Sequence, residues 1–104
     1  MRSPSELKKE IEARLKSYLS RDRSGIRHAV LDLFVRIKAL TIPQITGELQ
    51  KRFSISYHSV ASMVGIIASR LGILHVKRNA DGTHTIYELK EQYVDVVVKM
   101  LGTS

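Results

Sequence analysis

Apolar residues return at helical spacing along most of the chain, so the sequence predicts a mainly helical protein. A first helix begins at Ser3, because Ser3 and Glu6 have the spacing of a capping box and Pro4 suits the first helical position. This helix ends in a polar connection over residues 20–25. Residues 26–40 are apolar on more than one face, which predicts that they form the central helix of the domain.

A tight turn separates two further helices. Thr41 and Gln44 form a second capping box, where a third helix begins. Residues 54–56 are too few for anything but a turn, and Ser56 is a good N-cap for a fourth helix. That helix ends at Gly72, because glycine readily adopts the left-handed conformation found after helices.

A β-hairpin follows the fourth helix. Two β-prone runs, 73–78 and 84–89, flank a loop that contains an Asp-Gly pair. Alternation alone leaves open which of their residues face the core. Residues 40–42 suit one more, very short strand. The last segment, 90–101, has four valines in five positions, as a strand would, but its helical spacing and charged flanks favour a fifth helix.

The length of 104 residues suits one domain and is too short for two independent cores. We therefore expect one α+β domain of about five helices and one hairpin over residues 1–104. Its parts are the N-terminal helices (1–40), a helix–turn–helix pair (41–72), the hairpin (73–89) and a C-terminal helix (90–104).

Composition removes several functional classes. Hydrophobic residues make up 43% of the chain and charged residues 26%, as in ordinary globular proteins. The absence of cysteine excludes disulfides, a thiol nucleophile, cysteine-ligated zinc and iron–sulfur clusters. No apolar run approaches the roughly 18 to 20 residues of a transmembrane helix, and the first residues lack the apolar stretch of a secretory signal. We expect a cytoplasmic protein without membrane association.

The chain is strongly basic. Seventeen Lys and Arg against ten Asp and Glu give a formal charge of +7 and a pI of about 10.0, which favours nucleic acid as the partner. The basic residues gather around the fourth helix and the hairpin, where they are either phosphate contacts or simply solvated. Arg78, close to the hairpin tip, is the best placed to reach a minor groove. The residues expected on the DNA backbone are Gln44, Lys51, Arg52, Lys77, Arg78 and His84.

The fourth helix has one face that its apolar residues leave free. In a helix-turn-helix the second helix lies in the DNA major groove, so this free face would contact bases or phosphates. A merely solvated face is the alternative. Gly65 indicates close approach, either of a partner or of the central helix. Ile66 beside it is a contact to a thymine methyl, a dimer contact or an ordinary exposed residue. The residues expected to contact DNA are Tyr57, His58, Ser59, Ser62, Ser69 and Arg70.

Three short patterns stand in order along the chain: Ile45, Leu49, Ile55, Ser56 and Val60 at their spacing, then Leu71-Gly72-Ile73-Leu74, then Asp81-Gly82-Thr83. Over residues 41–89 this order resembles the winged helix-turn-helix superfamily, and in particular its small archaeal single-domain members with flanking helices. The resemblance implies binding to double-stranded DNA, commonly as a homodimer. It places the second helix in the major groove and the hairpin, or wing, on the backbone or minor groove. The implied role is transcriptional regulation, although few Arg, Lys, Asn or Gln residues on the free face argue against strong base-specific readout.

Other chemistries lack their motifs. The four histidines have no short paired spacing for a metal, and no phosphate-cradling loop, dinucleotide fingerprint or nucleophile elbow is present. We therefore expect neither an enzyme nor a cofactor. Two alternatives to DNA binding stay open: a winged helix that binds another protein, and a basic surface that binds structured RNA.

The first and last helices have apolar stripes that need a partner. They pack either on each other within one chain or on a second chain, and we favour a homodimer through them. The residues of this tentative dimer surface are Leu7, Ile11, Leu15, Tyr93, Val97, Met100 and Leu101.

Overall fold

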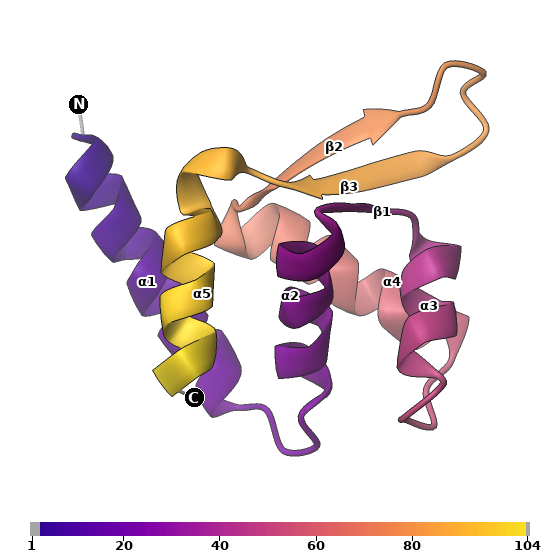
Figure 1. Ribbon diagram of the computed structural model, residues 1–104, viewed down its shortest axis with the longest axis horizontal. Helices are drawn as coiled ribbons and strands as arrows, with labels where there is room; N and C mark the ends of the chain where they lie inside the picture. Colours follow the sequence, from indigo (N-terminus) through magenta and orange to yellow (C-terminus); the bar gives the residue numbers. More distant parts are fainter. Residues whose placement is uncertain (1–2, 104) are drawn as a thin grey trace.

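Five α-helices and a three-stranded antiparallel sheet make up the fold in the computed structural model, which describes residues 3–103 (Figure 1). The helices are α1 (Pro4–Ser20), α2 (Ile26–Ile37), α3 (Ile42–Leu49), α4 (Tyr57–Ile66) and α5 (Val94–Thr103). The strands are β1 (Ala39–Leu40), β2 (Leu74–Arg78) and β3 (Thr85–Leu89). The α+β class is confirmed, whereas the outer bounds of the expected 1–104 domain include Met1, Arg2 and Ser104, which lie outside the described residues.

Three helices begin at the predicted caps. The Ser3 hydroxyl accepts a hydrogen bond from the Glu6 amide, and Ser56 does the same for its own helix. At Thr41 the capping box is complete, because the Gln44 side chain in turn accepts from the Thr41 amide at 2.9 Å.

The central helix ends earlier than predicted. We expected it to span residues 26–40, but Lys38 has a left-handed backbone conformation (φ 77°) and α2 stops at Ile37. The next two residues form β1, with Leu40 opposite Tyr87 of β3. Pairing with a strand almost fifty residues away therefore determines this boundary, and the very short predicted strand lies at 39–40 rather than 40–42.

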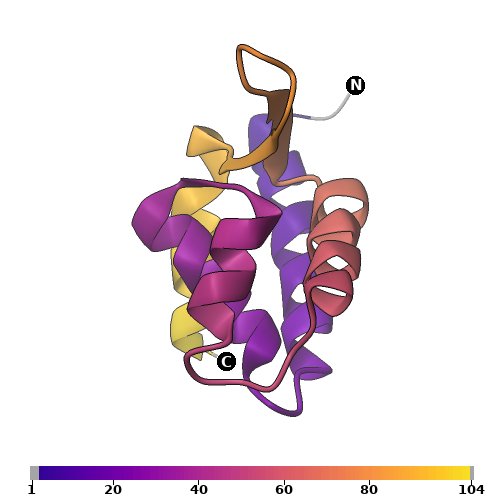
Figure 2. The ribbon, with the colours of Figure 1, turned by 90° about the vertical axis from the view of Figure 1, so that its right-hand side faces the viewer.

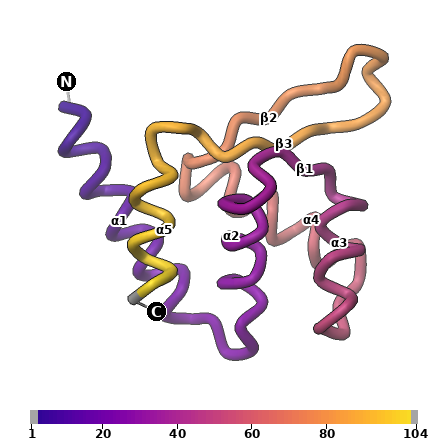
Figure 3. Tube along the Cα trace, in the orientation of Figure 1, coloured from indigo at the N-terminus to yellow at the C-terminus, as the bar shows by residue number. Residues whose placement is uncertain are grey.

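One core cluster includes buried residues of all five helices and of the three strands. Within it the first and last helices lie side by side, although they come from opposite ends of the sequence (Figure 3). Phe34 of α2, Leu15 of α1 and Val97 of α5 are fully buried. The hydrophobic effect of this burial is the main term that holds these three helices together.

The tentative dimer stripe is covered by its own chain. Ile11, Leu15, Val97 and Met100 are buried between the terminal helices, and Tyr93 and Leu101 are partly buried against the same core. Leu7 is exposed to 36%. Of the two arrangements expected for these stripes, the structure has packing within one chain, where α1 and α5 contact each other. A homodimer through them stays a prediction.

The sheet order is β1-β3-β2, and the β2–β3 hairpin extends beyond the helices (Figures 1 and 2). Leu74 pairs with Leu89 at the base of the hairpin, and both are buried. Arg78 pairs with Thr85 near its tip, where Gly82 takes a left-handed conformation in the loop. The predicted hairpin is confirmed.

A short 3₁₀ turn, η2 (Glu91–Tyr93), leads into α5, so the last segment is the predicted helix and not a strand. At the same base of the hairpin, just before β2, Gly72 has φ 71° and ends the helical region, also as predicted.

Candidate nucleic-acid interface

Helices α3 and α4 pack against each other across a short turn. Ile45 and Leu49 of α3 are buried, as are Val60 and Val64 of α4. The side-chain amide of Gln50 donates a hydrogen bond to the carbonyl of Ile55 at 3.0 Å and so closes the turn. Sequence reasoning did not find this contact, because a glutamine at a helix end has many possible partners.

The exposed face of α4 is made mainly of small side chains. Its centre follows one line along the helix at spacings of four, three and four residues: His58, Ser62, Gly65 and Ser69. Tyr57 and Ser59 are also exposed, and Tyr57 keeps 55% of its surface accessible. Figure 2 shows no other element over the outer side of α4. A partner can therefore approach the backbone of this helix closely.

Gly65 decides between two explanations for a glycine at this position. Apart from the backbone of its own helix, no heavy atom lies within 4 Å of the place that a Cβ would occupy. Packing against the central helix is therefore the wrong explanation. The carbonyl of Gly65 accepts a hydrogen bond from the Ser69 hydroxyl at 2.8 Å, which holds Ser69 against the helix.

The end of this helical region differs from the expected regular helix. After Ile66 the chain continues as a π-helical segment, η1 (Ile67–Leu71), before Gly72 ends it. Ile66 and Arg70 line a groove beside α1. Arg70 is therefore separated from the centre of the exposed face, where the sequence had placed it among the DNA contacts.

The hairpin places its two basic residues on opposite faces. Leu74, Val76 and Arg78 alternate onto the face that carries the buried Leu89, so this is the core-side face. Lys77 belongs to the outer face. The sequence pattern left this orientation open.

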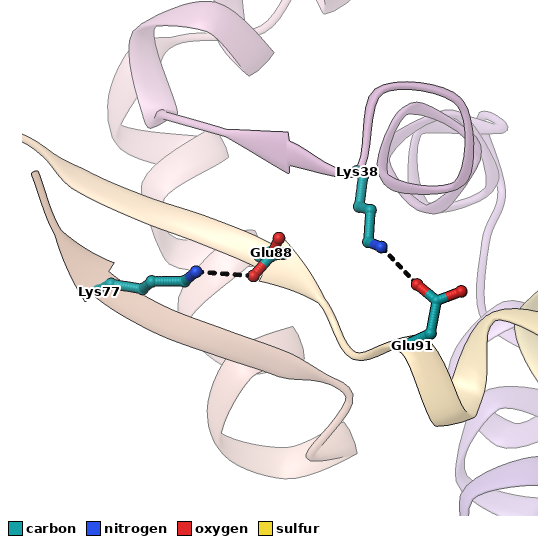
Figure 4. A network of polar contacts seen from close by, with 4 residues as sticks. All are labelled: Lys38, Lys77, Glu88 and Glu91. Carbon is teal, nitrogen blue, oxygen red and sulfur yellow. Dashed lines mark hydrogen bonds and ion pairs between the residues drawn. The ribbon is translucent and has the colours of Figure 1, made fainter.

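Lys77 also has a partner. Its ammonium group lies 2.9 Å from the Glu88 carboxylate, and Lys38 forms a second ion pair with Glu91 close by (Figure 4). A hydrogen bond and the positive charge of Lys77 lower the pKa of Glu88, and the bond to Glu91 raises the pKa of Lys38. The charge of Lys77 is therefore largely balanced. Arg78 differs, because among the described residues it donates only to the carbonyl of Gly82, at 3.1 Å.

The hairpin loop is held by its own polar side chains. The side-chain carbonyl oxygen of Asn79 accepts hydrogen bonds from the backbone amides of Thr83 and His84 at 3.0 and 3.2 Å. Asp81 accepts from the Thr83 hydroxyl at 2.7 Å, and this bond lowers the pKa of Asp81. Such a loop presents a defined shape to a partner.

Two of the residues expected to contact the DNA backbone lie close together near the hairpin. Gln44 at the start of α3 and His84 of the hairpin both line a hollow of about 410 Å³ between these elements. The charged pair at the end of α3 differs in its contacts: Lys51 forms an ion pair with Glu48 at 3.1 Å, whereas the Arg52 guanidinium lies 5.3 Å from the centre of the Phe53 ring. Arg52 has no acidic partner within residues 3–103.

Comparison with known proteins places the chain in a family. Residues 15–97 match the family model described as "Protein of unknown function (DUF2551)". The chain belongs to the DUF2551 family. It is 40% identical over 93 residues to a protein of Archaeoglobus fulgidus described as "Uncharacterized protein", which covers 88% of this chain and 93% of the relative. No solved structure matches the chain.

The DUF2551 match begins within α1 and ends within α5, so it includes α3, α4 and the whole hairpin. The relative is archaeal, as the resemblance implied, but no winged helix-turn-helix family is among the matches. Among the described residues, no three His, Asp or Glu side chains lie close enough to hold a metal ion. No helix in the same part of the chain is long and apolar enough to cross a membrane.

Proposed function

We propose that this chain is a winged helix-turn-helix protein that binds duplex DNA and regulates transcription. In this proposal α4 enters the major groove and the β2–β3 hairpin contacts the backbone or the minor groove.

The observation that carries the proposal is the uncovered face of α4 between two unpaired arginines. Figure 2 shows α4 between the α3–α4 turn at the bottom of the view, which carries Arg52, and the hairpin at the top, which carries Arg78. Neither arginine has an acidic partner among the described residues. Phosphate contacts from neighbouring elements hold such a helix in the groove, and in this proposal Arg52 and Arg78 supply them.

The side chains on α4 suit close contact more than base discrimination. Base-specific readout relies on long bidentate groups such as Arg, Asn and Gln, and the central line of the face has only His58, Ser62 and Ser69 besides a glycine. We therefore propose that phosphate contacts supply most of the affinity and that sequence preference is modest.

Exposed apolar residues support a second function. Tyr57 and Val76 keep 55% and 54% of their surface accessible, and such residues are common in protein interfaces. A winged helix that binds another protein is the corresponding alternative, and structured RNA is a further one.

Fluorescence anisotropy with random duplex DNA, single-stranded DNA and duplex RNA tests these functions. We expect binding that favours the DNA duplex and weakens strongly between about 50 mM and about 200 mM salt. The reason is that binding releases cations from the phosphates, and this release is less favourable at higher salt. Equal binding to duplex RNA would replace the DNA proposal with RNA binding. No binding to any nucleic acid at the lower salt concentration would leave the protein-interaction function in its place.

A further inference from the structure

A groove separates α1 from the end of α4 and the η1 segment. Its volume is about 450 Å³, within the range of small-molecule sites. It lies beside the exposed face of α4 and includes neither the α3–α4 turn nor the hairpin.

Four arginines line this groove and no acidic residue does: Arg14, Arg21, Arg27 and Arg70. Arg14 is paired with Glu10 at 3.1 Å. Arg21, directly after α1, and Arg70 of η1 line the same groove, and neither has an acidic partner within residues 3–103. Among the described residues that line the hollow, positive charge is therefore in excess.

The remaining lining is apolar or aromatic. Ile66 has 38% of its surface accessible, and Leu71 and Tyr18 complete this side. The Arg27 guanidinium lies 4.5 Å from the centre of the Tyr18 ring and donates to the Tyr18 carbonyl at 2.9 Å. Both contacts hold the ring in place as a flat apolar surface.

Tyr18 also has an unused hydrogen-bond donor. Its hydroxyl is buried and has no hydrogen-bond partner among the described residues. Burial raises the pKa of Tyr18 to about 12, so the hydroxyl keeps its proton at neutral pH. Because this hydroxyl is buried, Tyr18 presents its ring rather than a free donor to the groove.

We propose that this groove binds a small organic anion with an apolar or aromatic part. Its anionic group, a carboxylate, sulfonate or phosphate, bonds to Arg21 and Arg70, since planar guanidinium groups match such oxygens. Its apolar part lies against Ile66, Leu71 and the Tyr18 ring. The proposal does not depend on DNA binding, because the groove lies apart from both Arg52 and Arg78.

The test is a fluorescence titration of the complete chain, without DNA, with 1-anilinonaphthalene-8-sulfonate, an aromatic sulfonate. We expect saturable binding at one site per chain. Arg21→Gln and Arg70→Gln should each weaken this binding about tenfold, as expected for a lost hydrogen bond to a charged group. Ser17→Phe, a change at an exposed position on the groove wall, should block binding without altering charge.

The matched control is Arg36→Gln, which removes the same charge from α2 at an exposed position outside the groove. It should bind the probe as the unchanged protein does. Circular dichroism confirms that each variant is folded. Benzoate and phenyl phosphate should displace the probe, and the stronger competitor identifies the preferred anionic group.

Three results would overturn the proposal: no saturable binding, equal binding in Arg21→Gln, Arg70→Gln and Arg36→Gln, or full binding in a folded Ser17→Phe variant. Because the titration contains no nucleic acid, its failure leaves the DNA proposal intact. Equally, a protein that binds no DNA can still bind the probe.

Discussion

The exposed face of α4 and the groove beside its C-terminal end use neighbouring parts of one helical region in different ways. On the face, small and mostly neutral side chains leave the helix backbone accessible, and the unpaired positive charges lie at a distance, on the α3–α4 turn and the hairpin. In the groove, four arginines from α1, the connection after it, α2 and η1 surround one hollow.

Together the two proposals imply that the arrangement of charge, more than its amount, selects the kind of anion. Separated cations suit an extended polyanion whose charges are also separated, because each contact is made with a different phosphate. Cations that surround one hollow suit a single compact anion, because several donors bond to the same group. The net charge of +7 contains no such distinction.

The largest effect should come from removing both cations that flank α4. The double change Arg52→Ala with Arg78→Ala should weaken binding to random duplex DNA about hundredfold at low salt, since each lost phosphate contact costs about tenfold. Anisotropy measures this change and the accompanying shallower salt dependence. Binding of the aromatic sulfonate should stay unchanged. Unaltered DNA affinity would contradict the comparison, because Arg52 and Arg78 would then not be the phosphate contacts beside the exposed face of α4.

A large side chain on the exposed face should have the next largest effect. Gly65→Leu should weaken DNA binding about tenfold, because the larger side chain keeps α4 away from the base edges in the DNA major groove. Gly65→Ala is the matched control, and it should stabilise the protein by about 0.5–1 kcal/mol because the position is helical and its surroundings are open. Urea unfolding measures the second change. If the leucine variant bound DNA normally, α4 would not approach its partner closely.

Tyr18→Phe tests, through the pH dependence of the free energy of unfolding, whether the Tyr18 hydroxyl in the groove wall is buried. The folded protein keeps the tyrosine proton up to about pH 12, whereas the unfolded chain loses it near the ordinary value of 10.0. The contribution of Tyr18 is therefore complete below pH 10 and declines as the pH rises towards 12. Unfolding curves at several pH values should show a shallower decline for the phenylalanine variant, and at neutral pH a stability within about 1 kcal/mol of the unchanged protein. The same decline in both proteins would show that the hydroxyl is not buried.

The smallest effect should come from Lys77, which distinguishes the two faces of the hairpin. Lys77→Ala should weaken DNA binding less than about threefold, compared with about tenfold for Arg78→Ala, because Glu88 already balances the lysine. In the Lys77→Ala variant the pKa of Glu88 should rise towards its ordinary value, which an NMR titration detects. Equal losses in the two variants would mean that both faces of the hairpin contact the nucleic acid.

The sequence by itself determined the features that local contacts control. Ser3, Thr41 and Ser56 start helices because their side chains bond amides three residues away, and Gly72 ends one because it has no Cβ to oppose a left-handed backbone. The order of helices and hairpin followed from these positions together with the apolar spacing. The basic residues proposed as phosphate contacts could be identified from the sequence, but the ion pairs that some of them form could not.

Only the tertiary structure decided the features that join distant parts of the chain. Pairing with β3 ended α2 at Ile37, the register of the hairpin separated Lys77 from Arg78, and burial between α1 and α5 covered the tentative dimer stripe. The arginine groove likewise joins Arg21 to Arg70 across almost fifty residues. Each of these depends on which surfaces meet after folding, and local spacing has no information about that because many pairings satisfy the same apolar pattern.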